Sequence, residues 1–386
     1  MPTARILMNN HESASNRIAR QINRNLIFNQ IRLKQPISRA DLARASGLQR
    51  STVSLIVEEL LAERWIEEGA TTHIPRGRKP TVLNLNGKRV VLAMDIHPAQ
   101  TTTAVIDVGG TVISEENVEL PADPPKVIPA IVKALRKTIA SFAEYSFEGI
   151  GMSLPGRFNP RFEKSIFAPN IAWPIGSLKS QVEHATGLPV AADNVANACA
   201  LSEVWFGHSE PTSYLVAVNV SEGIGTGIFA NGQLMRGEGG VAGEFGHIQL
   251  DPDGPRCGCG GIGCWETVAS NRAGLRYYAE KTGRKLPTFN ALLQLVQAGD
   301  AAAGEALDRM CKALGRGMHM IGLAVAPGEI VVVGDITTLW SFAGPRIDAE
   351  MRRYPLVLAP RLRPALEGNK ARLRSAVSLI MSGKLL

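Results

Sequence analysis

The sequence predicts an α/β protein in which a small helical module with a β-hairpin precedes a larger body of alternating strands and helices. In the first 65 residues, apolar side chains recur at the three- and four-residue spacing of amphipathic helices. From residue 90 onward, short β-rich runs such as VVLAMDI (90–96) alternate with helical patterns such as VIPAIVKALRKTIASFAEY (127–145). With 386 residues, 45% of them hydrophobic and 20% charged, the chain has the size for two or three domains and the composition of a folded protein.

The excess positive charge is confined to the N-terminal quarter of the chain. Residues 1–89 carry 15 Lys/Arg and 7 Asp/Glu, a net charge of +8, whereas the remainder carries 27 and 28, a net charge of −1. A basic module attached to a neutral body is typical of proteins that bind a polyanion. A solvated basic surface would give the same count, so the fold of this region has to decide between the two.

The first two expected helices cover residues 16–35 and 37–47. The expected buried face of the first helix consists of Ile18, Ile22, Leu26 and Ile31. This helix is expected to end at Pro36, and the second to begin with Ser38 as its N-cap and to close at Gly47.

A third expected helix, residues 48–65, completes a helix-turn-helix with the second. Its inward-facing residues are expected to be Val53, Ile56, Val57, Leu60 and Leu61. Polar side chains stand at its N-terminal end: Gln49, Arg50, Ser51 and Thr52. The tight glycine turn between the two helices is typical of a helix-turn-helix. Since short polar side chains suit a helix end that contacts base edges, this end is expected to enter the major groove of double-stranded DNA.

The segment WIEEGATTHIPRGRKPTVLNLN (65–86) is predicted to form a β-hairpin with a basic tip. The tip carries Arg76, Arg78 and Lys79 beside a glycine, as in a wing that reaches phosphates or the minor groove. The three helices, the wing and the localised charge together predict a winged helix-turn-helix DNA-binding domain over residues 1–87.

Three of the five cysteines stand within eight positions, in the segment CGCGGIGCWE (257–266). With an upstream histidine, they would complete a tetrahedral Zn²⁺ shell, and the candidate ligands are His247, Cys257, Cys259 and Cys264. A complete shell leaves no position for an activated water, so the expected Zn²⁺ is structural. The spacing lacks the paired arms of a DNA-binding zinc finger, and reduced cysteines without a metal are the alternative.

The body of the chain contains several short segments that together are typical of one protein family. The central one is GEFGHIQLDPDGPRCGCGGIGCWE (243–266), with a glutamate–glycine–histidine motif before the clustered cysteines. The flanking segments are LPG (154–156), PNIAW (169–173), DNVANACALSE (193–203), EGIGTGIFANGQLMRG (222–237) and VVVGD (331–335). With these motifs the chain resembles the ROK family (repressor, open reading frame, kinase) over nearly its whole length. The N-terminal module points to the regulator branch, which includes the xylose and N-acetylglucosamine repressors.

The resemblance implies an actin-like (sugar kinase/ribonuclease H-like) fold of two α/β lobes with a cleft between them, over residues 88–386. It places the second lobe at about residues 194–365 and returns the C-terminal helix to the first lobe. In the family, the motif histidine binds the metal through one ring nitrogen and offers the other to a sugar hydroxyl. By resemblance, the sugar ligands of this chain are Gly156, Asn170, Asn194, Glu244, His247 and Glu266.

Two segments that a ROK kinase needs differ in this chain. The catalytic base of the kinases is an aspartate in a segment that aligns with NVAN (194–197), where this chain has Val195. The kinases follow their first strand with Asp-x-Gly-Gly-Thr, a phosphate cradle, whereas this chain reads His97-Pro98-Ala99 after LAMDI. The literal match DVGGT (107–111) falls at the end of the second expected strand and is expected to be a plain hairpin turn.

The leading hypothesis is a sugar-responsive, DNA-binding regulator of carbohydrate metabolism genes that represses transcription. It would bind a sugar or sugar phosphate without phosphorylating it, and would not be an enzyme. Two alternatives stay open: an ATP-dependent sugar kinase with an accessory DNA-binding domain, and an interaction protein whose cleft docks another protein. Helix-turn-helix proteins read two-fold half-sites, so a homodimer or homotetramer is expected. Without a membrane-spanning run or the apolar core of a signal peptide, a cytoplasmic location is expected.

Overall fold

The structure, a computed structural model, describes residues 16–69, 81–97, 100–159, 164–167, 171, 173, 175–207, 214–355, 358–368 and 370–385. The chain divides into two compact units, residues 1–89 with 384–386 and residues 90–383. In the described ranges, no helix combines the length and the apolar character that crossing a membrane requires.

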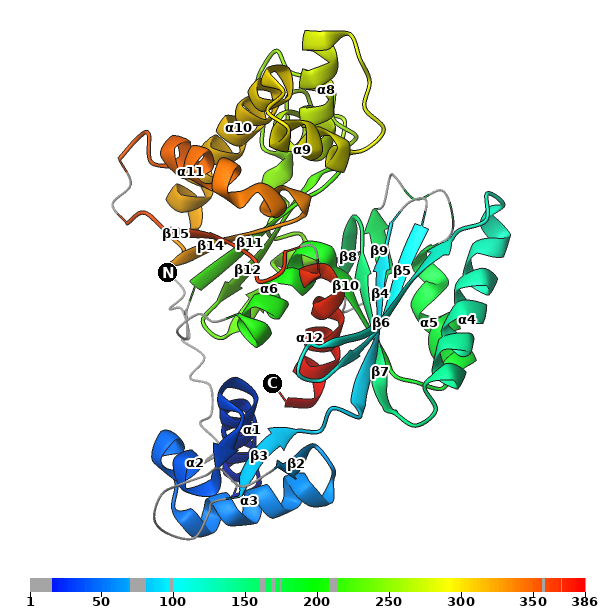
Figure 1. Cartoon of the computed structure of the whole chain (residues 1–386), viewed down its shortest axis with the longest axis vertical. Helices are drawn as coiled ribbons and strands as arrows, with labels where there is room; N and C mark the ends of the chain where they lie inside the picture. The colour runs from blue at the N-terminus through cyan, green and yellow to red at the C-terminus, as the bar shows by residue number, and fades with distance from the viewer. Residues whose placement is uncertain are drawn as a thin grey trace, which may run out of the picture. The chain divides into compact units, whose positions relative to one another are not determined.

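The described part of the first unit contains three helices and a small antiparallel sheet (Figure 1). The helices are α1 (Asn16–Lys34), α2 (Arg39–Ser46) and α3 (Arg50–Ala62). The strands are β1 (Ile37–Ser38), β2 (Ile66–Gly69) and β3 (Val82–Leu85), in the order β1-β3-β2. Strands β2 and β3 are the two arms of the predicted hairpin. Its basic tip, with Arg76, Arg78 and Lys79, lies outside the described residues.

The sequence of α2 fixes both of its ends. The Ser38 hydroxyl accepts a hydrogen bond from the backbone N–H of Asp41, as expected of an N-cap. Gly47 adopts a φ of 71°, the left-handed conformation that closes a helix without steric cost. Since only residues 47–49 separate α2 from α3, the two helices meet at the tight turn that the glycine predicts.

The buried face of α1 differs from the one that the apolar spacing predicts. Its buried residues are Ile27, Phe28 and Ile31. Two ion pairs join the N-terminal half of the same face to α3: Arg20–Glu59 and Arg24–Glu63. Because arginines face α3 there, Ile22 is 59% exposed, and the prediction for this residue is wrong. The predicted Ile31 is buried, and the side chain of Ile18 lies outside the described residues.

Two five-stranded sheets form the frame of the second unit in its described residues. The first has the order β10-β7-β4-β5-β6, and its strands are β4 (Arg89–Ile96), β5 (Gln100–Asp107), β6 (Val112–Glu119), β7 (Ser146–Leu154) and β10 (Val190–Asn194). The second has the order β13-β12-β11-β14-β15, and its strands are β11 (Tyr214–Val220), β12 (Ile224–Ala230), β13 (Gln233–Met235), β14 (Glu329–Val333) and β15 (Arg361–Pro364). A separate hairpin pairs β8 (Arg157–Asn159) with β9 (Lys164–Phe167).

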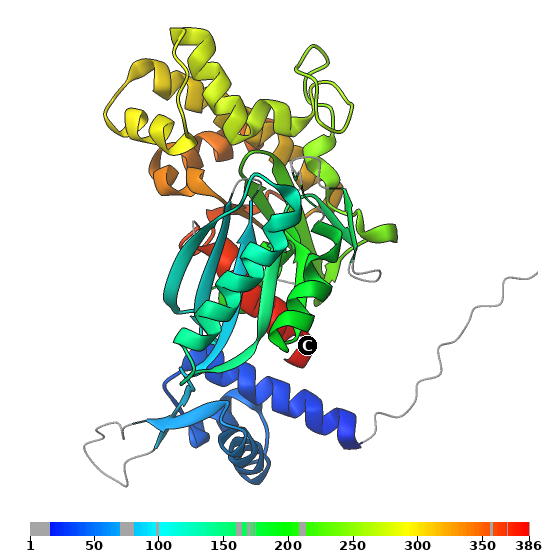
Figure 2. The same cartoon turned by 90° about the vertical axis from the view of Figure 1, so that its right-hand side faces the viewer.

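Helices cover the outer faces of both sheets and fill the layer between them. The first sheet carries α4 (Pro124–Ser141) and α5 (Leu178–Thr186), and the second carries α8 (Asn271–Thr282), α9 (Phe289–Gln297), α10 (Ala301–Val325) and α11 (Trp340–Met351). The middle layer contains α6 (Val195–Phe206) and the C-terminal α12 (Ala371–Leu385). Figures 1 and 2 show α12 on the face of the first sheet opposite to α4 and α5. The two sheets therefore share one helical layer and form two lobes.

Glycine lets α12 approach the first sheet closely. A Cβ atom at Gly151 of β7 would lie 2.2 Å from the carbonyl oxygen of Ala376, so a side chain there would push the helix away. Next to this contact, the hydroxyl oxygens of Ser153 and Ser375 lie 2.8 Å apart. On its other side, α12 shares a core with β14 through Leu379 and Val331.

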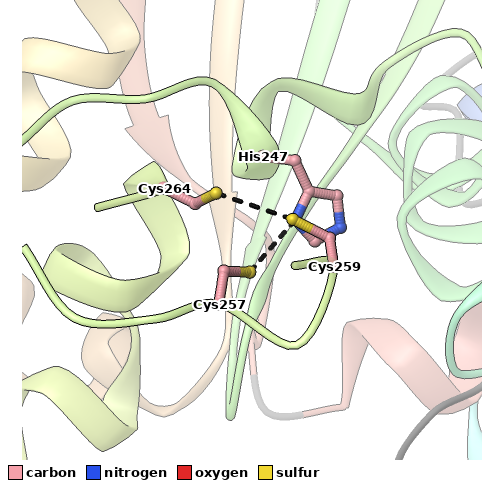
Figure 3. A group of neighbouring side chains, drawn as sticks. All are labelled: His247, Cys257, Cys259 and Cys264. Carbon is pink, nitrogen blue, oxygen red and sulfur yellow. Dashed lines mark hydrogen bonds between the residues drawn. The ribbon is translucent and has the colours of Figure 1, made fainter. Parts of the chain in front are cut away.

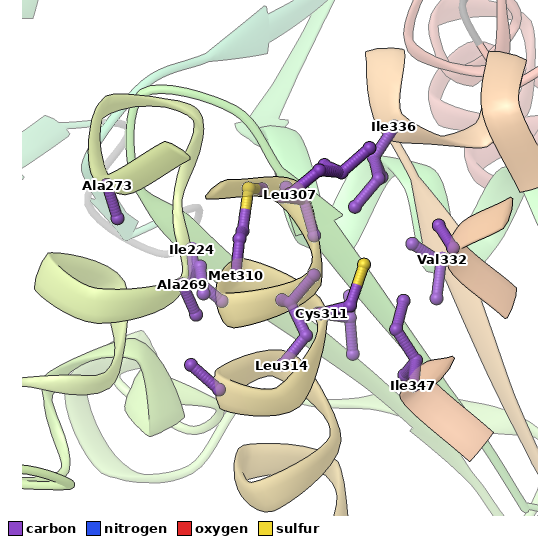
Figure 4. Close-up of a cluster of buried hydrophobic side chains, with 14 of the residues drawn as sticks. Ile224, Ala269, Ala273, Leu307, Met310, Cys311, Leu314, Val332, Ile336 and Ile347 are labelled. Carbon is purple, nitrogen blue, oxygen red and sulfur yellow. The ribbon is translucent and has the colours of Figure 1, made fainter. Parts of the chain in front are cut away.

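The core of the second lobe is built around α10 (Figure 4). Its buried residues include Ile224, Val332, Leu307, Met310, Leu314 and Ile347. The ring of Trp265, the first residue of the short helix α7 (Trp265–Ala269), is fully buried in the same core. Its Nε1–H group donates a hydrogen bond to the carbonyl of Ala313 at 2.9 Å. Trp265 follows Cys264 and precedes Glu266, so this packing fixes the position of both.

The literal DVGGT segment forms the turn between β5 and β6, as predicted. The N–H of Gly110 donates to the carbonyl of Asp107 at 2.9 Å, and the N–H of Thr111 donates to the Asp107 carboxylate at 2.8 Å. Gly110 has a φ of 94°, which favours glycine in such a turn. The conformation of the hairpin turn accounts for the glycine at position 110.

Two glycines of α10 provide a matched test of the packing around Trp265. A Cβ atom at Gly317 would lie 2.0 Å from the Trp265 ring, whereas one at Gly304 would have no neighbour within 4 Å. We expect Gly317→Ala to lower the free energy of unfolding by about 1–3 kcal/mol through overpacking. Gly304→Ala should raise it by up to about 1 kcal/mol, because alanine favours a helix. Urea denaturation measures both, and equal effects would contradict the tight contact.

Candidate functional site

Four potential metal ligands converge at the start of α7. His247 ends the short helix η3 (Glu244–His247), Cys257 and Cys259 lie in the following loop, and Cys264 is the N-cap of α7. Their ligand atoms all lie within 4.8 Å of one another (Figure 3). The Cys257 sulfur is 3.5 Å from His247 Nδ1, and the Cys259 and Cys264 sulfurs are 3.7 Å apart. This cluster could hold a metal ion, as the cysteine spacing predicts.

Short backbone contacts shape the loop that carries the cysteines. The N–H of Cys257 donates to the carbonyl of Gly261 at 2.8 Å, and the N–H of Gly260 returns a bond to Cys257 at 3.0 Å. Gly263 has a φ of 61°, and a Cβ atom there would lie 1.5 Å from the carbonyl oxygen of Asp251. Only glycine fits at this position, and the fold of the loop brings Cys264 back beside Cys259.

The protonation of the cysteines differs among the three positions. Burial raises the pKa of Cys257 and of Cys264, which favours their thiol forms. The Cys257 thiol donates a hydrogen bond to Glu266 Oε1 at 2.9 Å. A backbone hydrogen bond from Gly261 lowers the pKa of Cys259. Because metals bind thiolates, filling the cluster would displace the protons that Cys257 and Cys264 hold.

A cavity of about 210 Å³ lies beside the cysteine cluster, within the second unit. Five of the predicted sugar ligands line it: Gly156, Asn194, Glu244, His247 and Glu266. The sixth, Asn170, lies outside the described residues. The cavity has walls from both lobes, because Gly156 follows β7 of the first sheet and Glu244 begins η3 in the second lobe. Such a mixture of amide and carboxylate groups suits a ligand with many hydroxyl groups.

His247 connects the cysteine cluster to the cavity. Its Nδ1 atom faces Cys257 at 3.5 Å, and its Nε2 atom lies 3.5 Å from Glu244 Oε2, which lines the cavity. Glu266 also contacts both the cluster and the cavity: its Oε1 atom accepts a hydrogen bond from the Cys257 thiol, and the residue lines the cavity. A Cβ atom at Gly223 would lie 2.6 Å from Glu266 Oε2, so the glycine leaves room for this carboxylate.

Asn194, the last residue of β10, and Val195, the first residue of α6, stand at one wall of the cavity. The Asn194 side chain caps α6 by accepting from the N–H of Ala196 at 2.8 Å, and its amide donates to the carbonyl of Gly156. Val195 lines the cavity next to it and has no titratable group.

Asp193 is one residue from this wall but does not line the cavity. It is 1% exposed, lies 2.6 Å from Arg236 and accepts from Asn197 at 3.1 Å. Burial raises the pKa of Asp193, against the opposing effect of Arg236. Its carboxylate is therefore engaged with Arg236 and Asn197 and does not reach the cavity.

A buried ion pair lies at another wall of the cavity. Arg372 of α12 donates to Asp95 Oδ1 at 2.9 Å, and His97 Nε2 lies 3.0 Å from Asp95 Oδ2. Burial would raise the pKa of Asp95, but Arg372 and His97 together hold it below its usual value. Arg372 and His97 also line a second cavity of about 170 Å³, whose acidic residues are Asp95, Glu115, Glu222 and Asp335.

Sequence reasoning did not find the arginines of the main cavity, Arg157, Arg272 and Arg372. Arg157 directly follows the LPG motif, so its place in the sequence could have indicated a residue of the cavity. Arg372 contacts a residue 277 positions away, and no local pattern reveals such a pair.

The residues predicted to contact DNA lie at the N-terminal end of α3. Gln49 is the N-cap of the helix, and Arg50 and Ser51 are exposed, whereas Thr52 is half-buried. The exposed side chains leave this end of the helix accessible to a ligand. The tip residues of the hairpin lie outside the described part of the chain, so the structure brings only the helical part of the predicted interface together.

Comparison with known proteins finds transcriptional regulators that match most of the chain. A Bacillus spizizenii protein named xylose repressor is 31% identical over 327 residues, 84% of each chain. A crystal structure of a ROK family transcriptional regulator, described as a homologue of the E. coli MLC protein, matches with a TM-score of 0.76 and 26% identity. That match covers 95% of this chain and 98% of the other.

A kinase of the same family matches a smaller part of the chain. The structure of a ROK family glucokinase from Streptomyces griseus, in complex with glucose and AMPPNP, has a TM-score of 0.68 and 29% identity. It covers 76% of this chain and 100% of its own. The model of the ROK family itself matches residues 91–382, which include both lobes and the cysteine cluster. The chain belongs to the ROK family.

Proposed function

We propose that this chain is a sugar-responsive, DNA-binding transcriptional regulator, acting as a repressor of carbohydrate metabolism genes. The observation that carries the proposal is a polar cavity with an aliphatic side chain, Val195, where the kinases of the family have their base. Val195 can contact a sugar in this cavity but cannot take a proton from one of its hydroxyl groups. The relatives named as repressors over most of the chain support the same conclusion.

The first unit supplies the proposed DNA-binding domain, a winged helix-turn-helix over residues 1–87. Several arginines of this unit pair with acidic side chains, as Arg39 does with Glu58 and Glu68. Among the described contacts, no ion pair engages Arg50, which stands exposed in the first turn of α3. A guanidinium at a helix N-terminus can bind a phosphate or a guanine edge in the major groove.

The proposed effector is a sugar or sugar phosphate held by Glu244, Glu266 and His247. Carboxylates accept hydrogen bonds from hydroxyl groups, and an imidazole nitrogen can accept or donate one. Zn²⁺ is the metal that fits three cysteines and one histidine, and it would be held by His247 Nδ1 and the three sulfurs. Bound there, the ion supplies a fixed anchor for the imidazole, which leaves Nε2 directed toward the cavity.

The proposal includes the loss of phosphotransfer, and three features of the site support this loss. Val195 cannot act as a base, and Asp193 is engaged with Arg236 away from the cavity. The neighbouring cavity is lined by four acidic residues against Arg372 and His97, and this excess of acidic side chains disfavours the phosphates of a nucleotide there. The sugar would then act as a signal, provided that it binds two arrangements of the protein with different affinity. A two-fold homo-oligomer in the cytoplasm is the proposed form that reads the operator.

DNA binding is tested by reversing the charge of Arg50. We expect Arg50→Glu to weaken binding to the DNA upstream of the gene by about 5- to 150-fold, because a cation in the groove becomes an anion. Arg284→Glu makes the same charge change at an exposed residue of the second unit and should leave binding unchanged. Gel-shift titrations at several salt concentrations measure both. Wild-type affinity in Arg50→Glu would contradict the proposed domain.

Metal binding is tested by zinc content and by its dependence on pH. We expect about one zinc per chain, lost in Cys264→Ser and retained in Cys311→Ala, whose sulfur lies in the core of the second lobe. Affinity should rise with pH, because burial raises the pKa of Cys257 and Cys264 and the ion must displace their protons. Competition with a chromophoric chelator measures it, and an affinity independent of pH would speak against thiolate ligands.

The absence of kinase activity is tested with the purified protein, ATP and D-glucose, D-xylose or N-acetyl-D-glucosamine. We expect no sugar phosphate above the buffer control, because no base lines the cavity at position 195. The Streptomyces griseus glucokinase serves as the positive control for glucose. A thermal-shift screen with the same sugars and their phosphates identifies the effector by its higher Tm. ATP-dependent phosphorylation of any of them would favour the kinase alternative.

A further inference from the structure

An ion pair crosses the main cavity from one lobe to the other. Arg157 begins β8, directly after Gly156, and belongs to the first lobe. Its Nη2 atom lies 3.0 Å from Oε2 of Glu244, which begins η3 in the second lobe. Both side chains line the cavity, so the pair stands inside the space that the proposed effector would enter.

The carboxylate oxygen in this pair is the one that faces the histidine. Glu244 Oε2 lies 3.5 Å from His247 Nε2 as well as 3.0 Å from the guanidinium. At 3.0 Å, the guanidinium occupies one of the directions from which Oε2 can accept a hydrogen bond. A sugar hydroxyl that approaches Oε2 along this direction must displace the guanidinium.

The pair is easy to separate. Both side chains are 32% exposed, so water and salt screen their attraction. Exposed ion pairs of this kind change an equilibrium by about 1.5- to 5-fold. A pair of this strength, if it competes with the effector, weakens effector binding by a factor of the same size.

We propose that Arg157 is a positioning residue that competes with the effector for Glu244. The proposal rests on the proposed function, because it requires a neutral sugar in this cavity. In the free protein, Arg157 bridges the lobes through Glu244; in the bound protein, a sugar hydroxyl donates to Glu244 and the bridge opens. The residue thus sets the concentration at which the effector acts, and it disfavours sugars without a hydroxyl group at this position.

The consequence is an unusual dependence on salt. Binding of a neutral sugar by hydrogen bonds alone changes little with ionic strength. Here salt weakens the competing pair, so wild-type affinity for the sugar should rise when NaCl increases from about 0.05 to about 1 M. A variant without the guanidinium has no pair to screen, and its affinity should stay constant over the same range.

The test is isothermal titration calorimetry of the full-length protein with D-xylose, D-glucose and N-acetyl-D-glucosamine. We expect Arg157→Gln to bind its sugar about 1.5- to 5-fold more tightly than the wild type, and to lose the salt dependence. Arg157→Lys keeps the charge and should keep the salt dependence. Arg284→Gln removes a charge from an exposed residue outside the cavity and should behave as the wild type.

Equal or weaker binding by Arg157→Gln, with the wild-type salt dependence retained, would overturn the proposal. The salt titration of the wild type needs no variant, so it decides the question even if Arg157→Gln fails to fold; a flat or falling affinity then refutes the competition. Failure of the proposed function looks different, because neither these sugars nor their phosphates would bind the wild type, Arg157→Lys or Arg284→Gln at any salt concentration, and the competition would fall with it.

Discussion

The functional site depends on one imidazole ring with two different neighbours. His247 turns Nδ1 toward the cysteines and Nε2 toward the cavity, so whatever fixes one nitrogen also orients the other. Glu266 repeats the arrangement with Cys257 on one side and the cavity on the other. The cysteine cluster therefore orients two side chains of the cavity, His247 and Glu266. This role accounts for the position of the cysteine loop beside the cavity.

The packing of the second unit supports this arrangement from behind. Trp265 is buried under α10 and lies between the last cysteine and Glu266 in the sequence, so the core of the second lobe determines where both stand. At another wall of the cavity, the N-terminal end of α6 carries Asn194 and Val195. In the same helical layer, α12 packs closely on the first sheet at Gly151. Helices with apolar contacts hold Val195, Glu266 and Arg372 at the cavity, whereas other lining residues, such as Gly223 and Cys259, lie in loops.

Local patterns in the sequence were sufficient for much of the fold and for part of the site. The caps of α2, the arms of the hairpin and the turn at Asp107 follow from residues only a few positions apart, and the cysteine spacing located the metal cluster. The face of α1 was predicted wrongly because apolar spacing does not reveal that Arg20 and Arg24 pair with another helix. Arg157 and Arg372 were missed because their partners come from distant parts of the chain.

The contact between β4 and α12 also bears on how the chain is made. The carboxylate of Asp95 emerges from the ribosome early, whereas its guanidinium partner, Arg372, belongs to α12, 277 residues further along the chain. Until α12 has been made, the Asp95 carboxylate lacks its arginine partner, and burying it would be costly. The face of the first lobe that α12 covers therefore stays open in the nascent chain. That face closes only when α12 packs on it, and a chain without α12 would expose β4, a strand that the folded protein buries.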